Sequence, residues 1–222
     1  MRLVCFVVVV TSLWALACGA RAAIVFSLGQ PDYNLKPNES VVVPVSLEFT
    51  GSDAADLAAH GGLLSAAFRV VQTGAPPANP VMPTLLAANT ADFDDPILTP
   101  VFLGPSPTRA GIWEFADLTR SSGVLGQSSD PNSRIIPLGQ VTFTAGSSPG
   151  QTMFQVQAYD PTLQTTVTFD IPSLTLDGSI SPSTVTFNVV PEPELELVLL
   201  VAIPILLRAI TDRSLHESSG GQ

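Results

Sequence analysis

The sequence predicts an all-β fold, an antiparallel β-sandwich or jelly roll, and three observations support this prediction. Apolar and polar residues alternate with a period of two in many short segments, which indicates strands that each bury one face. Clusters of Pro, Gly, Asn and Asp separate these segments and favour turns. Segments with a helical pattern are scarce. Many short strands joined by such turns are typical of β-sandwiches and jelly rolls.

The strongest strand signal lies in residues 41–49, where Val43, Val45 and Leu47 fall on one side of the alternation. Proline has no N–H to donate to a neighbouring strand, so Pro44 predicts an edge strand or a bulge at that point. The same alternation predicts further strands at residues 24–28, 66–70, 113–115, 141–145, 154–158, 167–171 and 185–189.

Two short helices and one long loop complete the prediction. Residues 53–60 are helix formers, with Ser52 or Asp53 as the N-cap and Gly61 just past the C-terminal end. Residues 85–89 suggest a single helical turn. Residues 73–107 are rich in proline and show little periodicity, which predicts a long loop. Long loops on a rigid scaffold often carry function, so this segment is the expected place for a binding surface.

The first 22 residues have the features of a signal peptide. Arg2 supplies a positive start, and the uncharged, mostly apolar residues 3–17 are shorter than the ~20 residues that a membrane-spanning helix needs. Ala20 and Ala22 present small side chains at the two positions that signal peptidase reads, which predicts cleavage before Ala23. A buried N-terminal helix is the alternative interpretation.

Cys18 suggests a second alternative for the N-terminus. Residues 15–18 loosely resemble a lipobox, in which case a lipid on Cys18 would anchor the protein to a membrane. The only other cysteine is Cys5, so the chain after residue 22 contains none. A disulfide framework, a thiolate metal site and a cysteine nucleophile are therefore excluded for the mature protein.

The C-terminal segment, residues 191–213, resembles the PEP-CTERM sorting signal of exported bacterial proteins. Pro191, Glu192 and Pro193 precede the apolar run 197–207, and Arg208 follows it. The resemblance implies that a membrane protease of the exosortase type recognises this signal and releases the protein at the cell surface. The apolar run would halt export while the basic end stays in the cytoplasm. A polar tail, residues 214–222, follows. A buried C-terminal element is the alternative.

Residues 23–190 between these two segments are predicted to form one domain. This part contains five basic and fourteen acidic residues, a net charge of −9. So acidic a surface argues against nucleic-acid binding, which requires clustered Lys and Arg.

The order of features in this domain resembles the cohesin-like and carbohydrate-binding-module-like family of β-sandwiches. The resemblance is carried by the turn and strand of residues 36–45, the segments 62–70 and 136–144, and the turn and strand start at 148–152. It implies a non-catalytic binding sandwich. Members of that family bind dockerin modules or surface glycans.

The sequence contains no motif that predicts a catalytic site. Residues 146–150 fit the G-x-S-x-G pattern of a nucleophile elbow. However, Pro149 lacks the backbone N–H that the residue after the serine must lend to the oxyanion hole. We therefore interpret this segment as a hairpin turn. His60 is the only histidine of the domain, so neither a Ser-His-Asp triad nor a typical zinc site is expected.

Asp92, Asp94 and Asp95 suggest a calcium site. Alternating carboxylates in a loop can supply several of the 6–8 oxygen ligands that Ca²⁺ prefers. The spacing is not that of an EF-hand, and a solvated acidic loop is the alternative interpretation. No other cofactor is indicated.

Two further sets of residues suggest carbohydrate chemistry. Glu114 and Asp117 could contribute to a pair of carboxylates for glycoside hydrolysis, although spacing alone does not select a pair. Trp113 and Tyr159 could stack on a sugar, but aromatic residues in an alternating strand favour a position in the core.

These observations together predict an exported, surface-sorted β-sandwich without catalytic activity, which binds a ligand or builds the extracellular matrix or cell envelope. Its expected partners are signal peptidase and an exosortase-type protease during export, and a glycan or surface protein afterwards. One alternative is a secreted, carboxylate-dependent glycan hydrolase. The other is a surface protein that an uncleaved C-terminal segment keeps anchored in the membrane.

Overall fold

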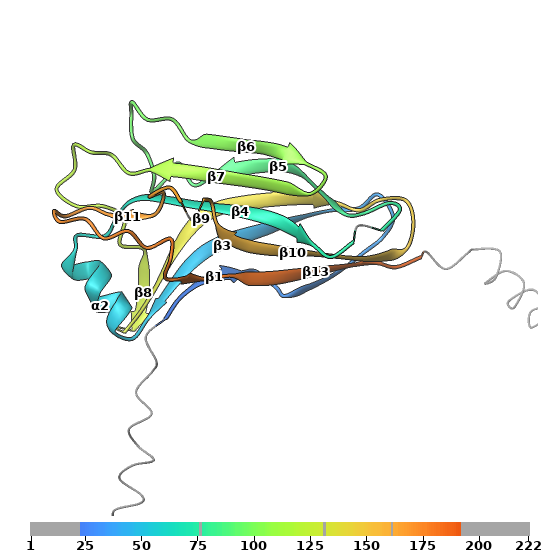
Figure 1. Ribbon diagram of the computed structural model, residues 1–222, viewed down its shortest axis with the longest axis horizontal. Coiled ribbons are helices and arrows are strands. Elements are labelled where there is room, and N and C mark those ends of the chain that lie inside the picture. Colours follow the sequence, from blue (N-terminus) through green and yellow to red (C-terminus); the bar gives the residue numbers. More distant parts are fainter. Residues whose placement is uncertain (1–22, 76, 131, 161, 192–222) are drawn as a thin grey trace, which may run out of the picture.

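A computed structural model describes residues 23–191 except residues 76, 131 and 161. The chain folds into two β-sheets that lie face to face, with one short helix at one end (Figure 1). The all-β prediction is thus confirmed. Sheet A contains, in spatial order, β12 (Ile180–Ser181), β1 (Ala23–Leu28), β3 (Ser40–Thr50), β9 (Ser133–Thr144) and β5 (Met82–Ala88), with β8 (Gln127–Asp130) also paired to β9.

Sheet B contains, in spatial order, β2 (Asp32–Leu35), β13 (Ser183–Val189), β10 (Gly150–Ala158), β4 (Leu63–Thr73), β7 (Arg109–Phe115) and β6 (Val101–Ser106), with β11 (Val167–Thr168) also paired to β4. Most pairs are antiparallel, but β1 runs parallel to β12 and β2 runs parallel to β13. The prediction of an antiparallel sandwich was therefore wrong at these two pairs. Each involves a strand of six residues or fewer, too short to show a clear alternation.

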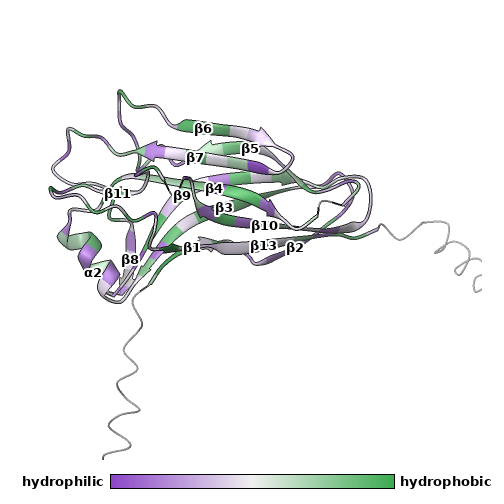
Figure 2. Ribbon diagram, in the orientation of Figure 1, coloured by the Kyte–Doolittle hydropathy of each residue, from purple (hydrophilic) through white to green (hydrophobic). Residues whose placement is uncertain are grey.

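The space between the sheets is filled by the apolar residues of the predicted alternation, which Figure 2 shows as hydrophobic bands along the strands. Three phenylalanines join the sheets at the centre. The ring of Phe143 on β9 lies 4.9 Å from that of Phe154 on β10 and 4.6 Å from that of Phe187 on β13, measured between centroids. Aromatic pairs at such distances stabilise the core beyond the apolar area that they bury.

Pro44 lies in a central strand, because β3 pairs with both β1 and β9. The edge-strand alternative was therefore wrong. The alternative of a bulge is confirmed, with the irregularity one residue after Pro44. The pairing of β3 with β9 shifts register between Val45 and Ser46. The pairing of β3 with β1 ends where Val45 meets Leu28, so that β1 no longer runs beside Pro44.

The expected helix is present as α2 (Ser52–Ala59), but Gly51 occupies its N-cap and no side chain caps it. The predicted N-cap residues were therefore wrong. Gly61 has a φ of +72° just past the C-cap, as predicted. Its N–H donates to the Ala58 carbonyl, and that of Gly62 donates to the Leu57 carbonyl, which together form a Schellman motif.

The proline-rich segment 73–107 is not a continuous loop, since it contains β5 and β6. The helical turn expected at residues 85–89 was wrong as well, because most of it belongs to β5. Both strands lie at the margins of their sheets, where proline and interrupted pairing are tolerated. Such edge strands carry exposed residues on both sides, so their alternation is weak in the sequence.

Two other segments also differ from the prediction. The turn at residues 146–150 connects β9 of sheet A to β10 of sheet B, so it crosses between the sheets and is not a hairpin. Its Ser147 hydroxyl accepts a hydrogen bond from Asn79 Nδ2 at 2.5 Å. The strand expected at 167–171 is limited to β11, and Ile171 is 97% exposed.

Most residues of the two predicted terminal signals lie outside the described residues. This applies to Cys18, Ala20 and Ala22 of the predicted signal peptide, and to the predicted sorting residues below. Ala23 is the first residue of β1. Within residues 23–191, no helix is long and apolar enough to cross a bilayer. Of the predicted sorting signal, Pro191 is described and exposed, whereas Glu192, Pro193 and Arg208 lie outside the described residues.

Candidate functional site

The outer face of sheet B carries several aromatic and amide side chains that point away from the core. On β4, the core residues Ala66, Phe68 and Val70 alternate with outward-pointing Ala67, Arg69 and Val71. Directly paired residues share a face of a sheet, so the registers of β7 and β10 against β4 identify the other members. They are Arg109, Gly111, Trp113 and Phe115 on β7, and Met153, Gln155 and Gln157 on β10.

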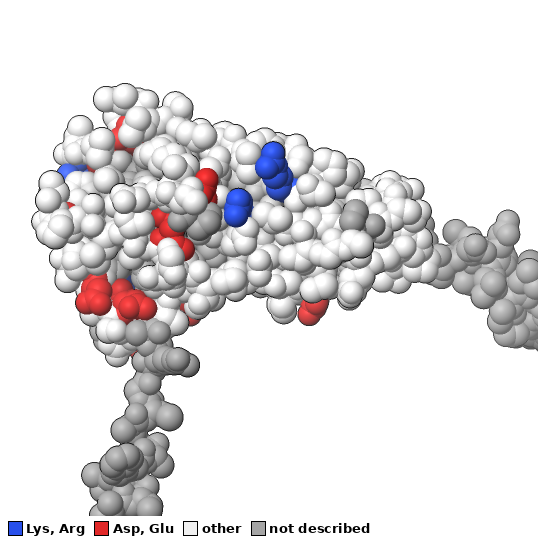
Figure 3. Space-filling model, viewed as in Figure 1, with Lys and Arg blue, Asp and Glu red and all other residues white. Residues whose placement is uncertain are grey.

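The outer face of sheet B carries little charge for so acidic a molecule. Figure 3 shows basic atoms near the middle of the visible surface and acidic atoms that gather towards the end that carries α2. Arg69 and Arg109 are the two basic residues on the strands of this sheet, and Asp32 is the acidic residue on its outer face. A ligand for this face is therefore expected to bind by hydrogen bonds and stacking.

A ladder of side-chain amides crosses three neighbouring strands of sheet B. Gln151 on β10 donates from Nε2 to Asn188 Oδ1 on β13 at 3.0 Å, and Asn188 Nδ2 donates to Asn34 Oδ1 on β2 at 3.4 Å. Gln151 and Asn34 are exposed, and Asn188 between them is half-buried. Each amide carries both donors and acceptors, so the ladder retains free capacity for hydroxyl groups of a ligand.

A second polar group lies nearer the middle of the sheet. With the Gln157 amide oriented to satisfy both of its ends, its oxygen accepts from Arg69 Nε at 2.9 Å and Nη2 at 3.1 Å. In this orientation Gln157 Nε2 donates to Gln155 Oε1 at 3.2 Å. These contacts fix the Arg69 guanidinium in place on the open surface.

Three aromatic rings form a row beside Arg69. The Trp113 ring lies 5.0 Å from that of Phe115 and 6.3 Å from that of Tyr159. Gly111 allows this arrangement, because a Cβ there would lie 3.2 Å from Tyr159 Cδ2 and 2.8 Å from the Phe68 carbonyl oxygen. Trp113 therefore lies on the outer face, which corrects the expectation that it belongs to the core. Its indole Nε1 is buried within the row and has no hydrogen-bond partner among the described residues.

The aromatic row leads into an apolar cleft at the loop end of sheet B. The cleft has a volume of about 260 Å³ and is bordered by Phe115, Leu98 and Leu118. Leu98 is 41% exposed and Leu118 is 57% exposed, so the rim is open to solvent. The remaining lining residues are Leu64, Ser65, Ala116, Gln164 and Val167.

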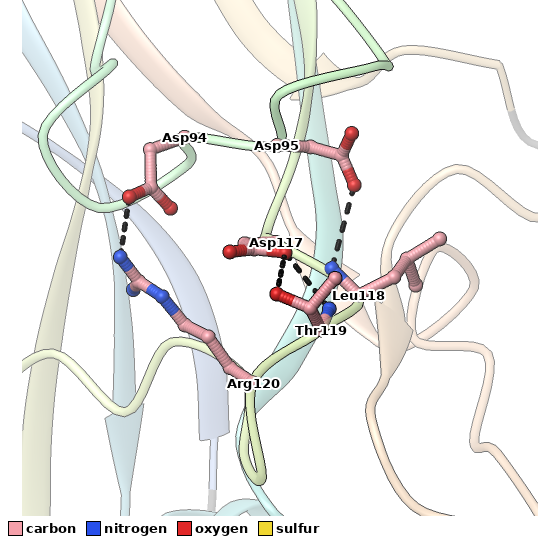
Figure 4. Close-up of polar contacts among 6 residues, drawn as sticks. All are labelled: Asp94, Asp95, Asp117, Leu118, Thr119 and Arg120. Atoms are coloured by element: carbon pink, nitrogen blue, oxygen red, sulfur yellow. Dashed lines mark hydrogen bonds and ion pairs between the residues drawn. The ribbon is translucent and has the colours of Figure 1, made fainter.

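Hydrogen bonds of two aspartates hold the loops around this cleft (Figure 4). Asp95 Oδ1 accepts from the backbone N–H groups of Ile97 and Leu98, both at 2.7 Å. Asp117 Oδ1 accepts from the backbone N–H of Thr119 at 2.8 Å and from its hydroxyl at 2.7 Å. Neither loop contains regular secondary structure at these points, so the carboxylates supply the order that a strand or helix would give.

The three aspartates of the calcium hypothesis are engaged separately. Asp92 Oδ2 accepts from Asn89 Nδ2 at 2.8 Å, and Asp94 forms an ion pair with Arg120 (Figure 4). Asp95 binds backbone N–H groups, as described above. Among residues 23–191, apart from the three positions not described, no three acidic, His or Cys side chains cluster so that they could hold a metal ion. The described residues thus give the calcium hypothesis no geometric support.

Glu114 lies inside the sandwich and is only 1% exposed. Its Oε1 accepts from the backbone N–H of Asn89 at 2.7 Å, and its Oε2 has no partner among the described residues. Burial raises the pKa of Glu114 to about 8, with a smaller opposing effect of the Asn89 hydrogen bond and a further increase from Asp92. Asp117, by contrast, is at the surface. The two carboxylates therefore do not face one accessible cleft, as glycoside hydrolysis would require.

His60, the candidate imidazole, lies at the C-cap of α2, where Nδ1 is 2.8 Å from the Asp56 carbonyl oxygen. This contact places His60 at the end of the helix.

The amide ladder and the Arg69–Gln157 contact were not predicted, because single Asn and Gln residues on strands carry no recognisable motif. The alternation pattern could have identified these residues only in combination with the strand pairing.

The chain matches no protein-family model, and no curated protein matches it significantly in sequence.

Proposed function

We propose that this chain is an exported, surface-sorted β-sandwich that binds a ligand without catalysing a reaction. The two terminal segments read from the sequence support export and sorting. The sandwich between them supports binding, because the outer face of sheet B combines aromatic rings with ordered polar side chains. Retention through an uncleaved C-terminal segment, residues 191–213, is the alternative for its place in the envelope.

The outer face of sheet B is the proposed ligand-binding surface, and a neutral polysaccharide is the proposed ligand. The observation that best supports this proposal is the row of three aromatic rings, Phe115, Trp113 and Tyr159. It lies beside the ordered amides of Gln155 and Gln157. Pyranose rings stack their apolar faces on aromatic side chains, and their hydroxyl groups pair with planar amide and guanidinium groups. The seven residues of β7 span roughly 20 Å, the length of several sugar units.

Affinity electrophoresis through gels that contain neutral polysaccharides tests this proposal. Gln157→Ala and Arg69→Ala should weaken retardation, since each removes half of the same polar pair. Gln140→Ala is the matched control, because Gln140 is exposed on β9 of sheet A. Equal retardation of all three variants, or no retardation of the unmodified protein by any neutral polysaccharide, would overturn the assignment.

Intact mass of the material recovered outside the cell tests export and sorting. Processing at both signals gives a species that begins at Ala23 and lacks the apolar run 197–207. A species that retains this run indicates membrane retention, and a species that retains the first 22 residues contradicts the signal peptide.

A further inference from the structure

Glu114 is a buried carboxyl group that joins the two sheets through one hydrogen bond. It lies on β7 of sheet B, where it pairs with the core residue Ala66 of β4 and therefore points into the sandwich. Its Oε1 accepts from the backbone N–H of Asn89, which directly follows β5 of sheet A. A titratable side chain thus holds the start of the loop that leaves β5.

This loop segment, residues 89–95, contains no strand or helix, and we call it the cover. Within it, the backbone N–H of Phe93 donates to the Asn89 carbonyl at 3.1 Å. At its far end, the backbone N–H of Asp95 donates to the Phe115 carbonyl at 3.2 Å. Phe93 is only 2% exposed and packs in the core. The cover is therefore held on β7 at both of its ends and anchored by one ring between them.

The cover leads directly into the rim of the apolar cleft. Asp95, its last residue, accepts hydrogen bonds from the backbone N–H groups of Ile97, Leu98 and Leu118. Movement of the cover away from β7 would carry Leu98 with it and break the bond to Leu118. The position of the cover therefore determines how firmly the rim is closed.

The surroundings of Glu114 favour its protonated form. The residue is 1% exposed and its Oε2 has no partner among the described residues, so an ionised carboxylate would lack the hydrogen bonds that compensate for burial. The carboxylate of Asp92, in the cover, opposes ionisation further. Burial and Asp92 outweigh the Asn89 hydrogen bond and raise the pKa of Glu114 to about 8.

The basic side chains of the neighbouring strands are directed elsewhere. Arg69 on β4 and Arg109 on β7 lie on the outer face of sheet B. Arg134 on β9 donates from Nη1 to the Leu125 carbonyl at 3.4 Å. Strands β5 and β6 contain no titratable residue, and the other two aspartates of the cover make the contacts described above. Among the described residues, a negative charge on this carboxyl group would thus have no cation to balance it.

We propose that Glu114 is a pH-sensitive switch that closes the cover while its carboxyl group is protonated and opens the cover when it is ionised. Opening brings the carboxylate into water, which stabilises a charge that has no partner in the core. It also withdraws the Phe93 ring from the core, and this cost keeps the cover closed while Glu114 is neutral. The cleft then has a firm rim in weakly acidic solution and a loosened rim in weakly alkaline solution, whatever ligand the protein binds.

The opening equilibrium should rise about tenfold per pH unit between pH 4.5 and about 8 and level off above this interval. The reason is that Glu114 regains its ordinary pKa of 4.5 in the open state, whereas the closed state raises it to about 8. Asp95 stays ionised throughout, because the folded protein holds its pKa below 3.8. The rim contacts of Asp95 are therefore not the cause of the change.

Hydrogen exchange of the full chain, followed by NMR at several pH values within this interval, tests the switch. The backbone amides of Asn89, Phe93 and Asp95 report opening of the cover. Each exchange rate is divided by that of the same amide in Glu114→Gln at the same pH, which cancels the intrinsic pH dependence of exchange. Because Gln keeps an acceptor for Asn89 but cannot ionise, this ratio should rise about tenfold per pH unit. Glu48→Gln, on the outer face of sheet A, is the matched control and should behave like the unmodified protein.

Amides of the central strand β10, such as those of Phe154 and Val156, distinguish opening of the cover from unfolding of the whole protein. They should exchange far more slowly than the cover amides. Low concentrations of urea should accelerate their exchange and leave that of the cover unchanged, because local opening exposes little surface.

A second variant keeps the test decisive if Glu114→Gln does not fold. Asp92→Asn retains an acceptor for Asn89 Nδ2 but removes the negative charge, so the rise in opening should level off at a lower pH than in the unmodified protein. A rate ratio that is constant with pH, cover amides that exchange as slowly as those of β10, or equal profiles for Asp92→Asn and the unmodified protein would overturn the proposal. None of these measurements involves a polysaccharide, so failure of the switch is distinguishable from failure of the proposed function.

Discussion

Asp95 is bound to Leu118 across the two loops that border the apolar cleft. Its Oδ2 accepts a hydrogen bond from the Leu118 backbone N–H at 3.4 Å, while its Oδ1 binds the N–H groups of Ile97 and Leu98. The hydrogen bond from Leu98 lowers the pKa of Asp95 most, followed by that from Ile97. One carboxylate thus positions both leucines of the rim.

Asp95→Asn should therefore loosen the rim of the cleft. Because the folded protein lowers this pKa, the contribution of Asp95 is present above its ordinary value of 3.8 and is lost as the pH falls through the lower folded value. The backbone amide signals of Ile97 and Leu98, followed by NMR in an acid titration, should shift in the unmodified protein and not in the variant. Asp94→Ala, which removes an exposed ion pair, should leave these amide signals almost unchanged. Identical titrations of Asp95→Asn and the unmodified protein would contradict the role of Asp95.

Glu114 should make the protein less stable in weak alkali. Its pKa rises from 4.5 to about 8 on folding, so the folded state holds the proton more tightly than the unfolded chain. The stabilising contribution of Glu114 is fully present below pH 4.5 and is lost as the pH rises towards 8, by at most about 5 kcal/mol. Glu114→Gln should remove most of this dependence in urea unfolding at several pH values. Glu48→Gln on the outer face of sheet A is the control, and equal pH profiles for Glu114→Gln and the unmodified protein would refute the effect.

Phe187→Ala should be among the most damaging substitutions of the core. The ring lies 4.6 Å from Phe143 and 6.1 Å from Phe154, so its removal opens a cavity between the two sheets. Such truncations typically reduce the free energy of unfolding by roughly 3–5 kcal/mol. Met153→Ala, at a 39% exposed position of sheet B, should cost far less in the same denaturant titration. A similar loss in both variants would show that the aromatic cluster is not the centre of the core.

Gly139→Ala should separate β5 from β9. Gly139 has a φ of +125°, and a Cβ there would lie 2.4 Å from the Ala87 carbonyl oxygen on β5. Backbone strain of this kind costs about 1–3 kcal/mol, and the clash with β5 adds to it. Gly104→Ala is the matched control, since a Cβ at Gly104 meets no atom within 4 Å. Thermal unfolding should show a lower midpoint for Gly139→Ala alone, and an unchanged midpoint would exclude this close approach.

The long central strands could be predicted from the sequence because each buries one face completely, which produces a clear alternation. The alternation misled at β7, where Trp113 and Phe115 suggested the buried side. The structure buries Ile112 and Glu114 instead, and the aromatic pair lies outside. The pairing of β7 with β4 decides which side of β7 is buried. The edge strands β5 and β6 were missed because they bury too little to alternate.

The sequence indicated some individual residues of the candidate binding face, but not how they are arranged. Trp113 and Tyr159 were possible sugar-stacking residues, but nothing in the sequence indicated that their rings would meet 6.3 Å apart. That contact depends on Gly111, which leaves room for Tyr159 above β7. The amide ladder likewise depends on the parallel pairing of β2 with β13, a contact between residues far apart in the chain.

The direction of β13 determines how a tethered molecule would present itself. Val189, at its end, lies opposite Gly150, at the start of β10. The apolar cleft, bordered by Phe115 at the far end of β7, lies at the opposite tip of the elongated sandwich (Figure 1). If the protein is attached through the residues that follow β13, the cleft lies at the tip most distant from the point of attachment. A ligand can then approach it from the side away from the anchor.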